Sequence, residues 1–319
     1  MANDVESMMY VGKTPWHGLG VPVPEGSRLS IEEAIVASGL NWDVELRHLF
    51  TEGQKNERLC VIGNYVTCRT SDNKVLGIVG RGYEPLQNRD AFKWFQPFLE
   101  SGEATIETAG SLKGGSRIWV LAKIKRDPMT VGKEDILEHY ILLSSSHDGS
   151  LAVRIGFTPI RVVCNNTLCL AHESKASRLL RARHIKGVLE TLEDIRDTID
   201  LAQQEFVATV DQYKRLASKQ VNSTELVKYI RLVFCLKERE RTPAQQKQEK
   251  IVPSVVRLFE YGRGSRMAGN NYWGAYNAVN EYLNYFRGEC QDNTLSSLWY
   301  GEGSSLNKRA LVIAMKNVN

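Results

Sequence analysis

Apolar positions follow two different spacings along the chain, and the change falls near residue 171. Before it, short apolar and β-branched runs are bounded by turn residues, which is typical of β-strands. The runs 59–70 and 75–79, separated by the turn residues 71–73, predict a β-hairpin. Further strands are predicted at 104–109, 116–125, 140–146 and 152–170.

Two helices are predicted in the same half of the chain. Residues 88–100 place Phe and Leu side chains at helical spacing. The first fifty residues are rich in Gly and Pro, so we expect an irregular arm followed by one short helix at 30–38. Ser30 and Glu33 have the spacing of a capping box at the start of that helix.

After residue 171, apolar residues recur every three or four positions, and they predict one long helix of roughly forty residues whose apolar positions run from Ile185 to Leu216. Further helices are predicted at 224–239, 244–261 with an interruption at Pro253, 273–287 and 307–318. The fold class is therefore α+β: a β-hairpin and an antiparallel sheet with a packed helix in the N-terminal half, followed by the long helix and a helical C-terminal half. The expected domains are an arm and short helix at 1–50, an α+β core at 51–220 and a helical region at 221–319.

The composition is that of a soluble globular protein. With 319 residues, 42% of them apolar, the chain can fill a sizeable core. No stretch approaches the roughly 20 consecutive apolar residues of a membrane helix, and the first ten residues lack a signal-type apolar run. Six scattered cysteines without metal-finger spacing favour reduced, packed thiols. We therefore expect a cytoplasmic protein without membrane contact.

The net charge of +4 is too small to indicate a nucleic-acid binder, but the charge is unevenly distributed. Residues 104–186 contain 13 Lys and Arg against 7 Asp and Glu, whereas 1–103 contain 10 against 14. Segment 174–186, with five cations, predicts a phosphate-binding surface together with the preceding basic strands; a solvated helix face is the alternative. The candidate DNA-binding residues are Lys113, Arg117, Lys123, Arg154, Arg161, Asn165, Asn166, Lys175, Arg178, Arg181, Arg183 and Lys186.

Two groups of these candidates have a structural alternative. Asn165 and Asn166 end a β-rich run, where they fit a turn as well as a DNA contact. Aromatic residues beside amides and the Arg/Gly-rich loop 262–269 are candidates for stacking on exposed bases, although their helical spacing fits core packing slightly better. The candidate stacking residues are Trp119, Phe157, Tyr272 and Trp273.

Signatures of enzymes are missing from the sequence. It contains no phosphate-loop lysine, no dinucleotide fingerprint in a strand–helix context and no nucleophile elbow. His147, Asp148 and Gly149 fit a hairpin turn, and the carboxylates of the strand region have no metal-binding spacing. No catalytic residue, metal or cofactor is therefore predicted.

Four separated motifs resemble those of the phage/plasmid-like protein family built on domain of unknown function 932. They are residues 14–20 (TPWHGLG), Gly114-Gly115 ahead of 118–123 (IWVLAK), 161–168 (RVVCNNTL) and 273–282 (WGAYNAVNEY). The resemblance spans nearly the whole chain. It implies an origin in a mobile genetic element and supplies no established reaction.

The predicted order of elements also resembles, by topology only, the core of the Rad-fifty-two single-strand annealing superfamily. That resemblance implies a homo-oligomeric ring or filament with single-stranded DNA in a basic groove, and strand annealing without a nucleotide cofactor. We therefore expect a DNA-binding and strand-annealing recombination protein of a phage or plasmid, in the host bacterial cytoplasm. The alternative is a nucleic-acid-processing enzyme or a protein that counters host defence.

The sequence also gives expectations for the oligomeric state and for the N-terminal arm. The long helix, with an apolar stripe over most of its length, favours a homo-oligomer because the stripe needs a large partner surface. The N-terminal arm with Trp16 and His17 is expected to pack on the folded protein or on a neighbouring subunit and not to bind metal, because His17 has no second ligand nearby.

Overall fold

The computed structural model describes residues 5–12, 14, 18–132, 134–161, 181–197, 199–236, 250–287, 297–298 and 301–318, with only the backbone at 157–161, 195–197 and 199–206. The chain divides into two compact units, each with its own apolar core. The first comprises residues 1–125, 140–157 and 171–203, and the second comprises 126–139, 158–170 and 204–319.

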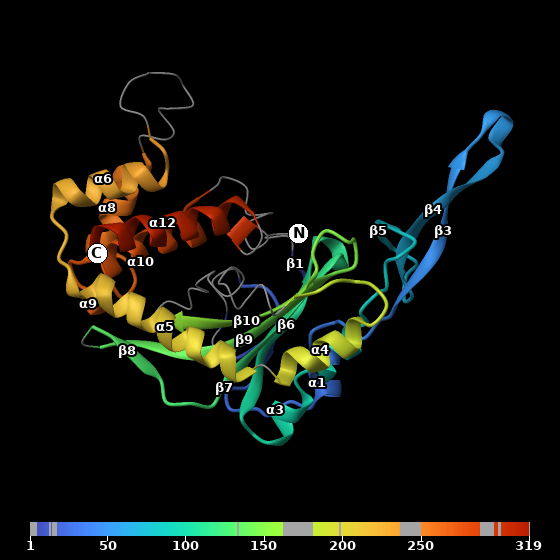
Figure 1. Cartoon of the computed structure of the whole chain (residues 1–319), viewed down its shortest axis with the longest axis horizontal. Coiled ribbons are helices and arrows are strands. Elements are labelled where there is room, and N and C mark those ends of the chain that lie inside the picture. Colours follow the sequence, from blue (N-terminus) through green and yellow to red (C-terminus); the bar gives the residue numbers. More distant parts are fainter. Residues whose placement is uncertain are drawn as a thin grey trace. The chain divides into compact units, whose positions relative to one another are not determined.

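The larger of two sheets has eight strands in the order β11, β10, β9, β7, β6, β1, β2, with β8 pairing with β9 (Figure 1). Strand β1 pairs with β2 in parallel, whereas the pairs β1–β6, β6–β7, β7–β9, β8–β9 and β10–β11 are antiparallel. The strands are β1 (Val5–Val11), β2 (Val21–Val23), β6 (Ala104–Leu112), β7 (Arg117–Ile124), β8 (Met129–Val131), β9 (Asp135–Ser146), β10 (Val153–Arg161) and β11 (Arg181–Ala182).

One face of this sheet forms the core of the first unit. Ile118, Val120 and Ala122 alternate along β7 and pack in one cluster with apolar residues of the helices α1, α2 and α4. The helix expected at 88–100 is divided into α2 and α3. Pro97 lies in the first turn of α3, where a proline is well accommodated. The helices are α1 (Ile31–Ala37), α2 (Asn88–Lys93), α3 (Gln96–Glu100) and α4 (Val188–Asp197), with a short 3₁₀ turn η3 (Lys113–Gly115) between β6 and β7.

The N-terminal segment differs from the irregular arm expected from the sequence. Residues 5–11 form β1, which lies between β6 and β2 inside the larger sheet. Met8, Met9 and Tyr10 are all buried although they are consecutive, so both faces of this strand are covered. A strand covered on both faces shows no alternation, which is why the sequence pattern did not reveal it. Trp16 and His17 lie outside the described residues.

The smaller sheet contains the predicted hairpin and one additional strand. Its order is β3 (Val44–Glu52), β4 (Arg58–Arg69), β5 (Val75–Gly80), with a short 3₁₀ turn η2 (Gln54–Asn56) joining β3 to β4. The hairpin of β4 and β5 is confirmed. The outer part of β3 and β4 forms a long two-stranded ribbon (Figure 1) on which most side chains are exposed, including Phe50, Leu59 and Ile62.

The second unit is mainly helical. Its core contains Tyr213, Tyr229, Trp273 and Tyr276, together with Val131 and Leu137 of the β8–β9 hairpin. In place of one long helix, α4 and α5 lie on either side of Thr198, which is outside the described residues, as is the predicted strand beyond Arg161. The helices are α5 (Ile199–Ser218), α6 (Ser223–Val233), α8 (Ile251–Tyr261), α9 (Ser265–Ala268), α10 (Tyr272–Tyr285) and α12 (Glu302–Val318). None of the described helices combines the length and the apolar character needed to cross a membrane.

Candidate nucleic-acid interface

The register of the larger sheet places several of the predicted DNA-binding cations on one face. Arg117 and Lys123 alternate along β7 with Ile118, Val120 and Ala122, which belong to the core, so both project from the opposite face. Val153, Ile155 and Ala182 belong to the same core cluster. Their neighbours Arg154 on β10 and Arg181 on β11 therefore project from the face of Arg117.

Three arginines lie at the same end of neighbouring strands on this face. Arg154 is directly opposite Arg181 in the β10–β11 register, and Arg117 is directly opposite Ser146 on β9. The turn after Ser146 leads into β10, so Arg154 is near the position across from Ser146. We call Arg117, Arg154 and Arg181 the arginine row. Directly opposite residues of an antiparallel pair have Cβ atoms about 5 Å apart, so the side chains of Arg154 and Arg181 leave the backbone close together.

The arginine row is charged and accessible at its outer end. Arg181 is exposed, whereas Arg117 and Arg154 are half-buried. Arginines at one end of these strands add positive charge to this face of the sheet, and an anionic ligand interacts favourably with a positively charged surface.

A carboxylate in the turn between β9 and β10 partly compensates the positive charge of Arg117. Burial raises the pKa of the Asp148 carboxyl, but hydrogen bonds from Ser150 and the charge of Arg117 outweigh it, so the pKa is lowered. Asp148 Oδ1 accepts the Ser150 backbone N–H at 2.8 Å, and Arg117 Nη2 donates to Ser150 Oγ at 3.1 Å. Asp148 thus carries a negative charge near Arg117, and Arg181, the exposed member of the arginine row, is the better candidate for a phosphate contact.

A buried polar layer fixes this turn. His147 Nε2 and Asn88 Oδ1 are 3.0 Å apart, and because an amide oxygen only accepts, Nε2 carries the proton. Asn88 Nδ2 donates to the carbonyl oxygens of Leu40 and Trp42, which fixes the orientation of the amide. Burial, together with the nearby His184, lowers the pKa of His147 to about 3, so this imidazole stays neutral. The predicted hairpin turn at His147 is confirmed, whereas these positioning residues were not predicted.

Two further contacts hold the strand ends that the turn connects. Tyr83 Oη donates to the Ser146 carbonyl oxygen at 2.8 Å, and its ring stacks on His184 at 4.9 Å between centroids. Ser146 Oγ accepts the Leu151 N–H at 2.9 Å and donates to the Leu151 carbonyl oxygen at 3.0 Å. A buried polar layer therefore fixes Ser146, which lies opposite Arg117, and the start of β10, which carries Arg154.

The other predicted cations are distributed more widely. Arg183 and Lys186 are exposed and follow β11 along the chain, and Lys113 is exposed on η3. Lys123 is half-buried and lies six residues along β7 from Arg117, a distance of about 20 Å, so it is not part of the arginine row. The side chain of Arg161 and the residues Asn165, Asn166, Lys175 and Arg178 lie outside the described part of the chain.

Three of the four candidate stacking rings are buried, so they offer no face to a base in this structure. Trp119 packs across from Gly110, where an added Cβ would lie 2.6 Å from Trp119 Cη2. Trp273 Nε1 donates to Asp135 Oδ2 at 2.7 Å, and Tyr272 packs edge-to-face on Tyr229. The core packing expected from helical spacing is therefore correct for Trp273, whereas the burial of Trp119, which lies on a strand, was not expected. The side chain of Phe157 is not among those described.

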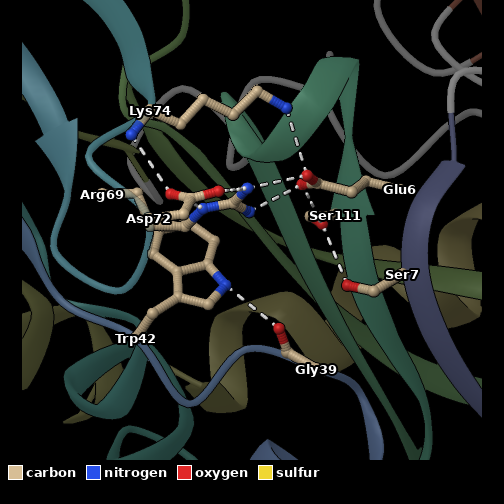
Figure 2. A network of polar contacts seen from close by, with 8 residues as sticks. All are labelled: Glu6, Ser7, Gly39, Trp42, Arg69, Asp72, Lys74 and Ser111. Carbon is tan, nitrogen blue, oxygen red and sulfur yellow. Dashed lines mark hydrogen bonds and ion pairs between the residues drawn. The ribbon is translucent and has the colours of Figure 1, made fainter.

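A second polar network joins the smaller sheet to the larger one (Figure 2). Glu6 of β1 accepts hydrogen bonds from Arg69 of β4, from Lys74 in the β4–β5 turn and from Ser111 of β6. Burial raises the pKa of Glu6, but the hydrogen bonds and charges of Arg69 and Lys74 outweigh it, so the pKa is lowered. Every named group in this network pairs with another, which is the pattern of a structural contact.

The contact between Glu6 and Arg69 also explains why residue 115, in the second of the four family motifs, is a glycine. Gly115 has φ +91°, and an added Cβ would lie 2.9 Å from Glu6 Oε2 and 3.1 Å from Arg69 Nη1. Only glycine combines this backbone conformation with so close an approach. Gly115 is therefore required by the contact between the two sheets.

Side chains of the types that bind metal ions are not grouped in the described parts of the chain. Within them, no group of three or more His, Cys, Asp and Glu side chains is arranged to hold a metal ion. Of the cysteines that can be described, Cys60 and Cys235 are exposed and Cys68 is buried, each as a free thiol.

Comparison with known proteins gives one match. The model of a family described as "Domain of unknown function (DUF932)" matches residues 75–299, which is more than half of the chain and includes the whole arginine row. No curated protein and no solved structure matches the chain. On the length of the family match, the chain belongs to the DUF932 family.

Proposed function

We propose that this protein binds single-stranded DNA and promotes the annealing of complementary strands, as a recombination protein of a phage or plasmid acting in the bacterial cytoplasm. The observation that carries the proposal is the register that sets Arg154 directly opposite Arg181, with Arg117 on the same face. Arginine presents five N–H donors in a planar fork and is well suited to phosphate oxygens. Arg183 and Lys186 extend the positive charge along the chain from β11.

Contacts of this kind hold the DNA backbone without reading its sequence. Annealing requires that property, because any pair of complementary strands must be accepted. The cations also offset the repulsion between two phosphate backbones while the bases pair. Base pairing supplies the free energy of the product, so the proposal requires no nucleotide cofactor. A homo-oligomer, as a ring or filament, would extend the same surface along a longer strand.

Arginine-to-alanine variants with a matched control test the proposal. Arg154→Ala and Arg181→Ala should weaken the binding of single strands of any sequence. Each should also flatten the dependence of log affinity on log salt, by about 0.7 for every phosphate that the variant no longer neutralises. Arg28→Ala is the control, because Arg28 is an exposed arginine ahead of α1 and away from the arginine row. Circular dichroism verifies that all variants are folded.

The annealing activity is measured with complementary labelled oligonucleotides, with and without magnesium. We expect the parent and Arg28→Ala to anneal the strands without shortening them, and Arg181→Ala to anneal more slowly. If the double variant of Arg154 and Arg181 is folded and binds and anneals like the parent at physiological salt, the arginine row is not the DNA site. Magnesium-dependent shortening of the strands would instead support a nucleic-acid-processing enzyme.

A further inference from the structure

The loop between α8 and α9 presents one arginine over an aromatic ring of α10. The Arg263 guanidinium carbon lies 4.3 Å from the centroid of the Tyr285 ring, and Arg263 is exposed. A guanidinium over a tyrosine ring is a planar cation held against an aromatic surface. Arg263 lies in the Arg/Gly-rich segment 262–269.

The backbone of this loop is held by a buried carboxylate. Glu281 of α10 accepts the Arg263 backbone N–H with both oxygens, at 3.2 and 2.9 Å. At Gly262 an added Cβ would lie 2.3 Å from the Leu258 carbonyl oxygen and 2.4 Å from Glu281 Oε2, so only glycine fits. Gly264 has φ +69°, which also favours glycine. The two glycines and Glu281 therefore fix where Arg263 leaves the backbone.

Two exposed aromatic side chains lie next to this pair along the chain. Tyr261 is two residues before Arg263 and has 80% of its surface exposed, and Phe286 follows Tyr285 directly and is 57% exposed. Exposed aromatic side chains next to an arginine–tyrosine contact are candidates for binding a partner. We call Tyr261, Arg263, Tyr285 and Phe286, which are grouped by their proximity along the chain to this contact, the Arg263 cluster.

The charge around the Arg263 cluster favours an anionic partner. Segment 250–287 contains five cations, Lys250, Arg257, Arg263, Arg266 and Arg287, against the two carboxylates Glu260 and Glu281. Glu281 is buried and engaged with the loop backbone, and Arg287 pairs with Glu302 at 2.6 Å. Exposed rings within an excess of positive charge are complementary to a polymer with flat bases and a negative backbone.

We propose that the Arg263 cluster stacks on unpaired bases of single-stranded DNA. This inference rests on the proposed function and assigns a second contact of a different kind: the arginine row holds phosphates, and the Arg263 cluster holds bases by their faces. Stacking accepts every base, because each has an aromatic face, so it is compatible with binding that is independent of sequence. It also acts only on unpaired strands, since paired bases are stacked on each other.

The two kinds of contact are separated by comparing an ordinary oligonucleotide with an abasic strand of the same length, which keeps the phosphates and lacks the bases. Phe286→Ala removes one ring, and Arg263→Lys keeps the charge while removing the planar group. Each should weaken binding of the ordinary strand about tenfold, as expected when stacking on one base is removed, and leave binding of the abasic strand unchanged. A 2-aminopurine base in the ordinary strand should be quenched by the parent and less so by both variants.

The matched controls are Val312→Ala, at an exposed apolar position on α12, and Arg181→Ala in the arginine row. Val312→Ala should bind both strands like the parent, and Arg181→Ala should weaken both. If Arg263→Lys and Phe286→Ala bind the ordinary strand like the parent while Arg181→Ala does not, the stacking site is wrong and the proposed function stands. Equal weakening on both strands also overturns base stacking, and a parent that binds neither strand overturns both proposals. Thermal unfolding midpoints verify that the variants are folded.

Discussion

Arg69 and Glu6 form a two-pronged ion pair in which Arg69 Nη1 donates to Glu6 Oε2 and Nη2 donates to Glu6 Oε1, each at 3.0 Å (Figure 2). The two side chains are only 11% and 15% exposed, and they come from different sheets. The Arg69 guanidinium also lies 5.2 Å from the centre of the Trp42 ring. This pair therefore connects the base of the β3–β4–β5 sheet to β1 of the larger sheet.

Replacing Glu6 should destabilise the first unit. Glu6→Gln removes one of the two carboxylates that pair with the mostly buried Arg69 guanidinium, and we expect the free energy of unfolding to fall by about 1–3 kcal/mol. Asp72→Asn is the matched control, because Asp72 also pairs with Arg69 but its side chain is 46% exposed, and solvent weakens exposed pairs, so we expect a smaller loss. Urea unfolding measures both effects. Equal losses of stability for the two variants would show that burial does not make the pair with Glu6 more stabilising than the pair with Asp72.

The buried histidine should make the protein sensitive to acid. His147 has a pKa of about 3 in the folded protein, below its ordinary value of 6.5, so between these values the unfolded chain binds a proton that the folded protein does not. The free energy of unfolding therefore decreases as the pH falls from 6.5 towards 3, by up to about 1.4 kcal/mol per pH unit from this group. Below pH 3 the protonation of His147 does not lower the free energy of unfolding further.

Comparison with His147→Gln isolates this contribution, because Glu6 and His184 also have shifted pKa values and remain in both proteins. Urea midpoints are measured at several values between pH 7 and pH 4. The variant should be less stable than the parent at pH 7, and the difference should shrink as the pH falls. A difference that stays constant with pH would show that folding does not lower the pKa of His147.

A variant of Trp273 should affect stability and not DNA binding. Trp273→Phe removes the indole N–H that donates to the buried Asp135 carboxylate, and we expect a decrease of about 1–3 kcal/mol in the free energy of unfolding. At a temperature where the variant is folded, its affinity for single-stranded DNA should equal that of the parent. Weaker binding by a folded Trp273→Phe variant would make this ring a candidate base contact again.

We expect light scattering to give a mass of at least twice that of the 36.0 kDa chain. The reason is the annealing proposal, in which several copies extend one DNA-binding surface. The measurement is made at micromolar concentration with and without a long single strand. A strict monomer under both conditions would count against annealing by an assembly, while leaving DNA binding by one copy to be tested separately.

Local features of the fold were predictable from the sequence. The capping box at Ser30 is present, with Ser30 Oγ accepting the Glu33 N–H at 3.2 Å and the Ser30 N–H donating to Glu33 Oε2 at 2.8 Å. The hairpin of β4 and β5 and helices α6, α10 and α12 also lie where the spacing predicted them. Each depends on residues within a few positions of one another. In contrast, β1 pairs with a strand about a hundred residues away, and its two covered faces hide the pattern.

The candidate site was predictable only in part. Composition identified Arg117, Arg154 and Arg181 as basic candidates, but only the strand register shows which of them lie at one end of one face. Aromatic residues at helical spacing have the same pattern in a core and on a binding surface, so the sequence could not separate Trp273 from Phe286. Burial separates them, since Trp273 is inaccessible and Phe286 is exposed.

The exposed ribbon of β3 and β4 implies a gradient of local opening along a single ladder. Around Phe50 and Leu59 the backbone hydrogen bonds are protected only by each other, because the side chains on both strands are exposed there. At Thr67 and Cys68, which are buried beside Arg69, opening the ladder requires disruption of the pair with Glu6. Amide protons should therefore exchange with deuterium rapidly in the outer ribbon and far more slowly at its base. The ribbon can thus flex at its end while the sheet that carries it stays closed.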